Sequence, residues 1–275
     1  LTRVQNIFLA TNNIEETSQK FSIFFGRSPN FIGQSRNLGI DIISFGLYKT
    51  NICLISPKSP GIWFEALNYF LKIKGEGIFG INFSSDDFDY DYNNFAKNDL
   101  KLSNKIESCF EGNNEKQIKF SFFNILDKTI EGLNILVSYE MDFQNNIENS
   151  NNNVNKVNQL VIQTEVPDSL KDIFERKLGI RLALDKTFKE WAGRMLFFRL
   201  GGVTLEVIEG KDIEQNTKYF GIGWHAENYN KCYNKLIDDG FSLSEIRKGR
   251  KEGTVVSTMK EPILNIPTIL IGLEE

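Results

Sequence analysis

The sequence predicts an α+β fold of four βαβββ modules, paired into two cupped half-barrels. Three observations support this prediction: a gapless internal repeat, a recurring strand-to-glycine spacing and one polar segment near the middle of the chain. The repeat aligns residues 4–57 with residues 157–210, an offset of 153 positions. Sequence similarity that recurs at a fixed offset indicates a repeated supersecondary unit.

The second copy of the repeat shows the module most clearly. Residues 157–164 are apolar and β-branched, as in a strand, and Pro167 stands where a helix would begin. Gly179 ends that helix, and residues 180–184 are expected to be extended. Gly201-Gly202 then separates two further apolar runs and predicts a hairpin turn.

Two weaker copies follow the same spacing. Gly26 and Gly240 occupy the helix-stop position of Gly179, whereas the second module has Asn98-Asp99 there. Asn tolerates the left-handed conformation that such a stop requires, so this difference is intelligible. We interpret residues 104–117 as an irregular insertion within the second module.

A polar, Asn-rich segment divides the chain into two halves. Residues 141–156 lack hydrophobic periodicity and predict a solvated linker. The expected organisation is therefore an N-terminal pair of modules at 1–140, the linker at 141–156 and a C-terminal pair at 157–275.

Composition excludes several classes of function. The net charge is −4 and the one basic run is residues 247–251, which does not favour nucleic-acid binding. No apolar run is long enough to cross a membrane, and three scattered Cys predict neither a disulfide framework nor a zinc knuckle. A reducing, cytoplasmic location is expected. The 23 Phe predict an aromatic core or a hydrophobic cavity, and core filling is the simpler interpretation.

Four βαβββ modules in two pairs resemble the vicinal oxygen chelate superfamily, which includes glyoxalase I, bleomycin-resistance proteins and extradiol dioxygenases. The C-terminal half is most similar to glyoxalase-like proteins of unassigned activity. The residues that support this likeness are WAGRMLFFR at 191–199, GGVTLEV at 201–207, GRKEGT at 249–254 and IPTILIG at 266–272. The resemblance implies that ligands bind inside the cups.

The resemblance also implies where a metal would bind. The matching positions of the C-terminal cup are Gln159, Glu206, Gly221 and about Leu270, of which two can coordinate an ion. Those of the N-terminal cup are Asn6, Cys53, Gly80 and about Asn134, with no carboxylate or His. We therefore expect no cofactor, with an incomplete divalent-metal site at Gln159 and Glu206 as the alternative, and we interpret the N-terminal cup as a degenerate copy.

Two residues are candidates for catalysis. Glu206 lies among apolar neighbours, so it is expected either to act as a general base of raised pKa or to hydrogen-bond with Gln159. His225 is the one His of the chain and would serve as an acid or base if it lines the cup. A dioxygenase site with two His and one carboxylate is excluded in its usual form.

The expected ligand is a small organic anion. Arg194 would bind a carboxylate or phosphate if it points inward, and would otherwise form an exposed ion pair. Phe198 and Trp224 would supply apolar lining. Arg247, Arg250 and Thr254 belong to a basic loop that either closes over the cup or forms a solvated turn. Nucleic acid and membrane are not expected partners, and a homodimer is a further candidate.

Two functions follow from these candidates. The first is a lyase or isomerase that acts on a small carbonyl or carboxylate compound in the C-terminal cup. The alternative is a non-catalytic binding or sequestering protein of the bleomycin-resistance type. Fold alone does not choose between them, because function depends on the site.

Overall fold

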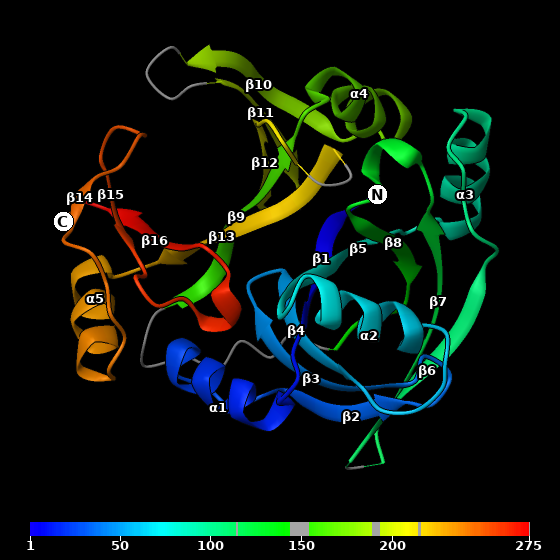
Figure 1. The fold of residues 1–275 in the computed structure, drawn as a ribbon, viewed down its shortest axis with the longest axis horizontal. Coiled ribbons are helices and arrows are strands. Elements are labelled where there is room, and N and C mark those ends of the chain that lie inside the picture. The colour runs from blue at the N-terminus through cyan, green and yellow to red at the C-terminus, as the bar shows by residue number, and fades with distance from the viewer. Residues whose placement is uncertain (114, 144–153, 189–192, 214–215, 275) are drawn as a thin grey trace.

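The computed structural model describes residues 1–113, 115–143, 154–188, 193–213 and 216–274 (Figure 1). The first module comprises β1 (Arg3–Ala10), α1 (Ile14–Phe25), β2 (Phe31–Ser35), β3 (Ile40–Leu47) and β4 (Thr50–Pro57), and α2 (Phe64–Ile73) follows it. The second comprises β5 (Gly77–Ser84), α3 (Phe88–Lys97), β6 (Ile106–Gly112), β7 (Gln117–Ile125) and, after a 3-10 turn at Lys128–Ile130, β8 (Asn134–Tyr139).

The C-terminal half repeats this order. The third module comprises β9 (Val154–Thr164), α4 (Pro167–Lys171) with a π-helical continuation (Asp172–Lys177), β10 (Arg181–Phe188), β11 (Gly193–Leu200) and β12 (Val203–Glu209). The fourth comprises β13 (Thr217–Ala226), α5 (Tyr229–Asp238), β14 (Arg247–Lys248), β15 (Thr254–Thr258), a 3-10 turn (Ile263–Asn265) and β16 (Thr268–Leu273). The predicted α+β fold of four βαβββ modules in two pairs is therefore confirmed.

The helix stops have the predicted geometry with one correction. Gly26, Gly179 and Gly240 all adopt positive φ angles, of 61°, 69° and 91°. In the second module Asp99, at φ 58°, takes the left-handed conformation, whereas Asn98 does not. The Asn98-Asp99 pair therefore ends the helix as expected, but its second residue makes the turn.

The N-terminal half is a closed barrel with the strand order β1-β4-β3-β2-β6-β7-β8-β5. Its last seam joins β2 to β6 through the pairs Gly33–Gly112 and Gln34–Glu111. A Cβ at Gly33 would lie 2.3 Å from the backbone oxygen of Glu111, so glycine permits this close approach. The interpretation of residues 104–117 as an irregular insertion is wrong, because β6 lies within them and closes the barrel.

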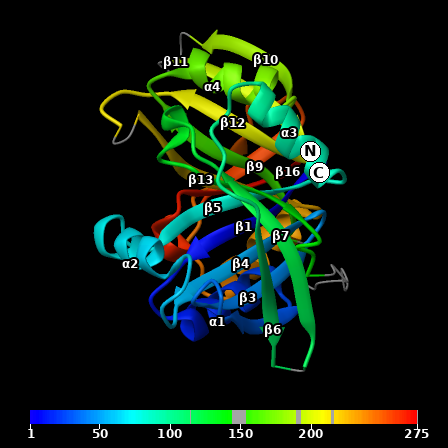
Figure 2. The same cartoon turned by 90° about the vertical axis from the view of Figure 1, so that its right-hand side faces the viewer.

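The C-terminal half is an eight-stranded sheet with the order β10-β11-β12-β9-β13-β16-β15-β14. Within the described residues, β10 and β14 stand at opposite edges of this sheet and do not pair with each other. Figure 2 shows the two halves one above the other, with β10 and β11 at the upper end and the β6–β7 hairpin at the lower end. The same module thus builds a closed barrel in the N-terminal half and an open sheet in the C-terminal half.

Side-chain alternation gives each sheet a helix-covered outer face and an opposite inner face. One hydrophobic cluster joins the outer faces of both halves, and Phe24 of α1 packs edge-on against Trp224 of β13 with ring centroids 5.6 Å apart. A second cluster fills the inside of the N-terminal barrel. The backbone N–H of Tyr48 also donates to the carbonyl of Asn155 at 2.7 Å, which ties β9 to the first half.

Residues at both ends of the predicted linker belong to the folded halves. Met141 and Phe143 are fully buried in the barrel, and residues 154–156 already belong to β9. Residues 144–153 of the predicted linker lie outside the described residues. Across the described chain, none of the helices is both long enough and apolar enough to cross a membrane.

Candidate functional site

The inner face of the N-terminal barrel is filled by its own side chains. Trp63 packs against Phe8, Phe79 and Phe122 with ring centroids 5.3, 6.2 and 5.9 Å apart. Phe110 stacks on Phe120 at 4.7 Å. Because these rings are almost wholly buried and touch one another, they form a core and leave the barrel interior closed to a ligand.

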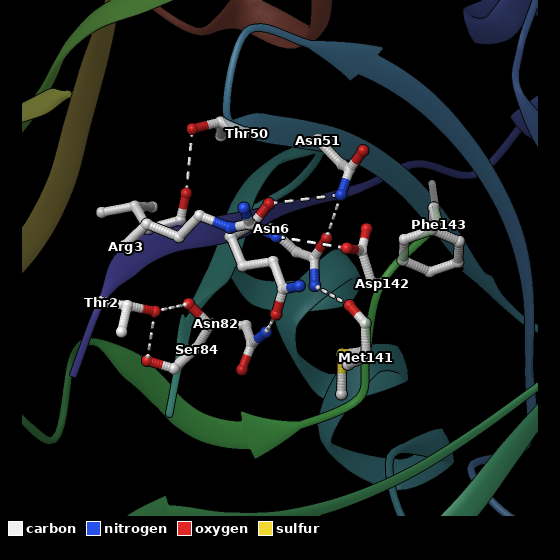
Figure 3. A network of polar contacts seen from close by, with 12 residues as sticks. Thr2, Arg3, Asn6, Thr50, Asn51, Asn82, Ser84, Met141, Asp142 and Phe143 are labelled. Carbon is white, nitrogen blue, oxygen red and sulfur yellow. Dashed lines mark hydrogen bonds and ion pairs between the residues drawn. The ribbon is translucent and has the colours of Figure 1, made fainter. Parts of the chain in front are cut away.

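Asn6, one of the metal positions implied for this barrel, takes part in a structural network instead (Figure 3). The amide of Asn6 accepts from the Asn51 side chain at 2.8 Å and donates to the Met141 carbonyl at 3.2 Å. Cys53 is fully buried, and burial raises the pKa of its thiol to about 12. Asn6 therefore anchors the segment that ends the first half, and Cys53 behaves as a small apolar residue.

The inner face of the C-terminal sheet carries a buried carboxylate. Glu206 of β12 is 3 % exposed, and its neighbours Leu205 and Val207 point to the opposite, helix-covered face. The Gln159 side chain of β9 donates to Glu206 Oε2 at 2.5 Å. A Cβ at Gly223 of β13 would meet the Gln159 side chain at 2.6 Å, so the glycine leaves room for this amide.

A charged side chain from the fourth module completes the group. Arg250, in the turn between β14 and β15, places Nη1 3.6 Å from Glu206 Oε1 and 3.9 Å from the sulfur of Met195. Met195 pairs across the sheet with Ile208, whereas Gln159 pairs with Thr204, so the two partners approach Glu206 from opposite ends of its strand. The basic turn thus reaches across the open sheet to the third module.

Burial is the dominant influence on the pKa of Glu206. Desolvation raises this pKa above its ordinary value, and the Arg250 charge and the Gln159 hydrogen bond oppose the shift without cancelling it. A carboxyl group with a raised pKa accepts and returns a proton closer to neutral pH than an exposed one does. The arrangement is therefore suited to proton transfer.

The donors of this face do not fit a resident metal ion. The Gln159 amide nitrogen and the Arg250 guanidinium occupy the two carboxylate oxygens of Glu206, and Gly221 offers no side-chain donor. Leu270, the fourth implied position, lies in the outer-face core. Within the described ranges, no three His, Cys, Asp or Glu residues gather as a metal site would require. The described residues of this face therefore do not form a metal site.

Three predicted ligand residues lie away from this inner face. Arg194 is held on the outer side by Asp185 and Asp168, each at 2.7 Å, and these bonds raise its pKa. Phe198 packs against Phe174 of the π-helical continuation of α4, with ring centroids 5.3 Å apart, and Trp224 belongs to the contact between the halves. Arg194 therefore takes the ion-pair alternative, and Phe198 does not line the inner face, because the β11–β12 hairpin register pairs Phe198 with Leu205 and Phe197 with Glu206.

The remaining predicted residues are near the site without joining it. His225 is half-buried and pairs with Lys156, five residues along β9 from the Val161 partner of Glu206, which is about 16 Å by strand rise. Burial, and then the Lys156 charge, lower the pKa of His225. Arg247 donates to the Thr258 hydroxyl at 2.8 Å, and the Thr254 hydroxyl donates to the carbonyl of Lys251 within the basic turn.

Sequence reasoning missed several residues of the inner face. Phe197 pairs directly with Glu206, and Arg199 pairs with Thr204, whose hydroxyl accepts from the Arg199 guanidinium at 2.6 Å. Arg181 of β10 lies directly opposite Arg199. The signal that would have found them is the two-residue turn at Gly201-Gly202, which fixes the pairing of β11 with β12.

Comparisons with known proteins establish the fold. No protein-family model matches the sequence, and no curated protein matches it. Among solved structures, a mutant of 4-hydroxymandelate synthase from Streptomyces coelicolor superposes with a TM-score of 0.71 at 10 % identity, covering 99 % of this chain and 93 % of that one. A hypothetical protein from Staphylococcus aureus gives 0.65 at 10 % identity, covering 99 % and 100 %.

A third match is a fusion of a xylose isomerase-like TIM barrel with 4-hydroxyphenylpyruvate dioxygenase, at TM-score 0.63 and 11 % identity. It covers 99 % of this chain and 49 % of that one. Both enzyme structures superpose over 99 % of this chain, so the fold expected from the resemblance is confirmed. Identities this low establish the fold and leave the activity to be argued from the site.

Proposed function

We propose that the C-terminal inner face binds a small carbonyl or carboxylate compound and that Glu206 moves a proton on it, as in an isomerase or lyase. The observation that carries this proposal is a 3 % exposed carboxyl group, held by Gln159 on one oxygen and facing Arg250 on the other. Burial of a carboxyl group costs the fold free energy, and groups with pKa values shifted in this way are concentrated at functional sites.

The chemistry assigns one role to each of the three side chains. The Glu206 carboxylate removes a proton from the carbon next to a carbonyl group. The electron pair of that C–H bond forms a carbon–carbon double bond, and the π electrons of the carbonyl group move onto its oxygen. The Arg250 guanidinium is placed to stabilise the negative charge that develops there. Gln159 holds the carboxyl group in position. Delivery of a solvent proton to the opposite face of that carbon completes an isomerisation, whereas departure of a leaving group from the next carbon with its bonding electrons completes a lyase reaction.

Solvent-exchange measurements test this proposal. The protein would be incubated in D₂O with pyruvate, 2-oxobutyrate or dihydroxyacetone phosphate, and deuterium at the carbon next to the carbonyl would be followed by NMR. We expect exchange with the wild-type chain and at least a hundredfold slower exchange with Glu206→Gln. Because the carboxylate is the active form, the rate should rise with pH through the raised pKa of Glu206.

The alternative is a binding or sequestering protein, and the same measurement separates it. The observation in its favour is that protein donors already approach both oxygens of Glu206. Saturable binding of a probe without any deuterium exchange would support this alternative and would contradict proton transfer. The proposed location remains the cytoplasmic one expected from the sequence.

A further inference from the structure

We propose that Arg181 and Arg199 form a second anion site on the same inner face and that it takes a phosphate monoester group. This inference rests on the proposed function in one respect only: both sites would serve one ligand. The arginine pair itself is a separate observation, since neither side chain contacts Glu206.

The two arginines face each other across neighbouring strands. Arg181 of β10 and Arg199 of β11 are directly opposite in an antiparallel ladder, so their side chains leave the sheet on the same face. That face is the inner one, because Phe198 and Leu182, the next pair along, pack on the helix-covered side. Like charges placed directly opposite each other destabilise a sheet.

No carboxylate relieves this repulsion within the described part of the chain. The Arg199 guanidinium donates to the Thr204 hydroxyl at 2.6 Å, and Arg181 has no ion-pair partner there. Arg194, on the same strand but on the outer face, is by contrast held by two aspartates at 2.7 Å each. This difference between Arg194 and the inner-face pair indicates that Arg181 and Arg199 bind an anion from outside the chain.

The pair has the charge and geometry that a phosphate requires. Two guanidinium groups supply two positive charges, which match the charge of about −1.5 to −2 on a phosphate monoester at pH 7, and each can donate two parallel hydrogen bonds. The Thr204 hydroxyl fixes one guanidinium in place. Lys186 lies opposite Met195, whose sulfur contacts Arg250 on the inner face. Its positive charge is therefore on the same face.

The spacing between the two sites suggests the shape of the ligand. Arg199 lies two residues along β11 from Phe197, the partner of Glu206, which is about 7 Å by strand rise. A ligand with its reacting carbon at Glu206 and its phosphate at the arginine pair therefore has a short carbon skeleton between them. The substrate class is a small phosphorylated carbonyl compound.

Binding of inorganic phosphate tests the inference without requiring the reaction. Calorimetric titration would use the wild-type chain and Arg181→Gln, Arg199→Gln and Glu206→Gln variants, with Arg36→Gln as the control. Arg36 is an exposed arginine of the N-terminal half that pairs with Glu111, so the control removes one positive charge elsewhere. All five proteins would first be compared by circular dichroism.

We expect wild type, Arg36→Gln and Glu206→Gln to bind phosphate, and each inner-face arginine variant to bind at least tenfold more weakly. Arg199→Gln should also unfold at the same or a higher temperature than wild type in phosphate-free buffer, because it removes the like-charge repulsion. Phosphate binding by Glu206→Gln without deuterium exchange would separate this site from the proton-transfer role. Failure of wild type to bind phosphate, or wild-type affinity in Arg199→Gln, would overturn the inference.

Discussion

The two inner faces of this chain carry different residues at equivalent positions of the repeat. Cys53 of the barrel corresponds to Glu206 of the open sheet, Asn6 to Gln159 and Gly46 to Arg199. The barrel adds Trp63 and a set of Phe rings that fill its centre, whereas the sheet leaves a carboxyl group and arginines on its inner face. The same module can therefore hold a packed core or a candidate site, depending on what covers its inner face.

Exchanging Cys53 and Glu206, the central residues of the two inner faces, should give the largest difference in stability between the halves. Cys53→Glu places a carboxyl group among buried Phe and Trp rings, so we expect a loss of more than about 4 kcal/mol in the free energy of unfolding. The reciprocal change, Glu206→Cys, removes a buried charge and should fold normally. Chemical denaturation followed by circular dichroism measures both. Equal effects of the two exchanges would contradict a core in one half and a site in the other.

Removing one aromatic ring from each inner face gives the next largest difference. Phe122 is fully buried against Trp63, so Phe122→Ala should cost about 3–5 kcal/mol. Phe197 is only half-buried beside Glu206, and Phe197→Ala should cost about 1 kcal/mol. Urea midpoints with unchanged slopes would give these values. A cost at Phe197 as large as that at Phe122 would indicate that the open sheet also has a packed interior.

The equivalent amides should have different roles. Asn6→Ala removes the side-chain donor of the Met141 carbonyl and the shorter of the two hydrogen bonds of the Asn51 amide inside the barrel, at a cost of about 1–3 kcal/mol. Gln159→Ala removes one donor from Glu206, so it should raise the pKa of Glu206 further and change stability less. Thermal unfolding at several pH values distinguishes the two. A loss at Gln159 as large as that at Asn6, and independent of pH, would assign Gln159 a purely structural role.

The smallest expected effect is a pH dependence. Because burial raises the pKa of Glu206 in the folded chain, the folded state holds this proton more tightly than the unfolded state does. Its contribution to the free energy of unfolding is therefore greatest below the unfolded pKa of about 4.3 and falls as pH rises toward the folded pKa. Glu206→Gln lacks this dependence.

The unfolding temperature of Glu206→Gln relative to wild type should therefore increase between pH 4 and pH 7. Asp185 supplies an internal contrast, because hydrogen bonds from Arg194 and Lys171 lower its pKa, so its stabilising contribution is lost as the pH falls. A constant difference between Glu206→Gln and wild type at every pH would contradict a raised pKa at Glu206.

The fold could be predicted from the sequence because the internal repeat reveals the βαβββ module. In three modules a strand and a helix are followed by a Gly that ends the helix, at positions 26, 179 and 240. One clear module is therefore enough to identify the others. The strand β6 escaped notice because residues 104–117 are polar and hydrophobic alternation is weak there. Its role depends on pairing with β2, a contact between modules that no local pattern reports.

The site was predictable only where register could be followed. Glu206 and Gln159 were placed on one face correctly, but Phe198 was assigned to that face as well, and Arg194 was left open between that face and an exposed ion pair. The turn at Gly201-Gly202 pairs Leu200 with Val203 and therefore Phe197 with Glu206, so Phe198 must point to the other side. The approach of Arg250 to Glu206 spans two modules, and sequence spacing alone does not determine such a distance.

Direct titration of Glu206 tests the central claim most directly. The protein would be labelled with ¹³C at the Glu side-chain carboxyl carbons, and the resonance absent from Glu206→Gln would identify the residue. We predict a pKa above the ordinary Glu range in wild type and a higher one in Arg250→Ala, because that variant removes the opposing positive charge. An ordinary pKa that does not respond to Arg250→Ala would contradict a buried, arginine-facing carboxyl group and the proton-transfer role built on it.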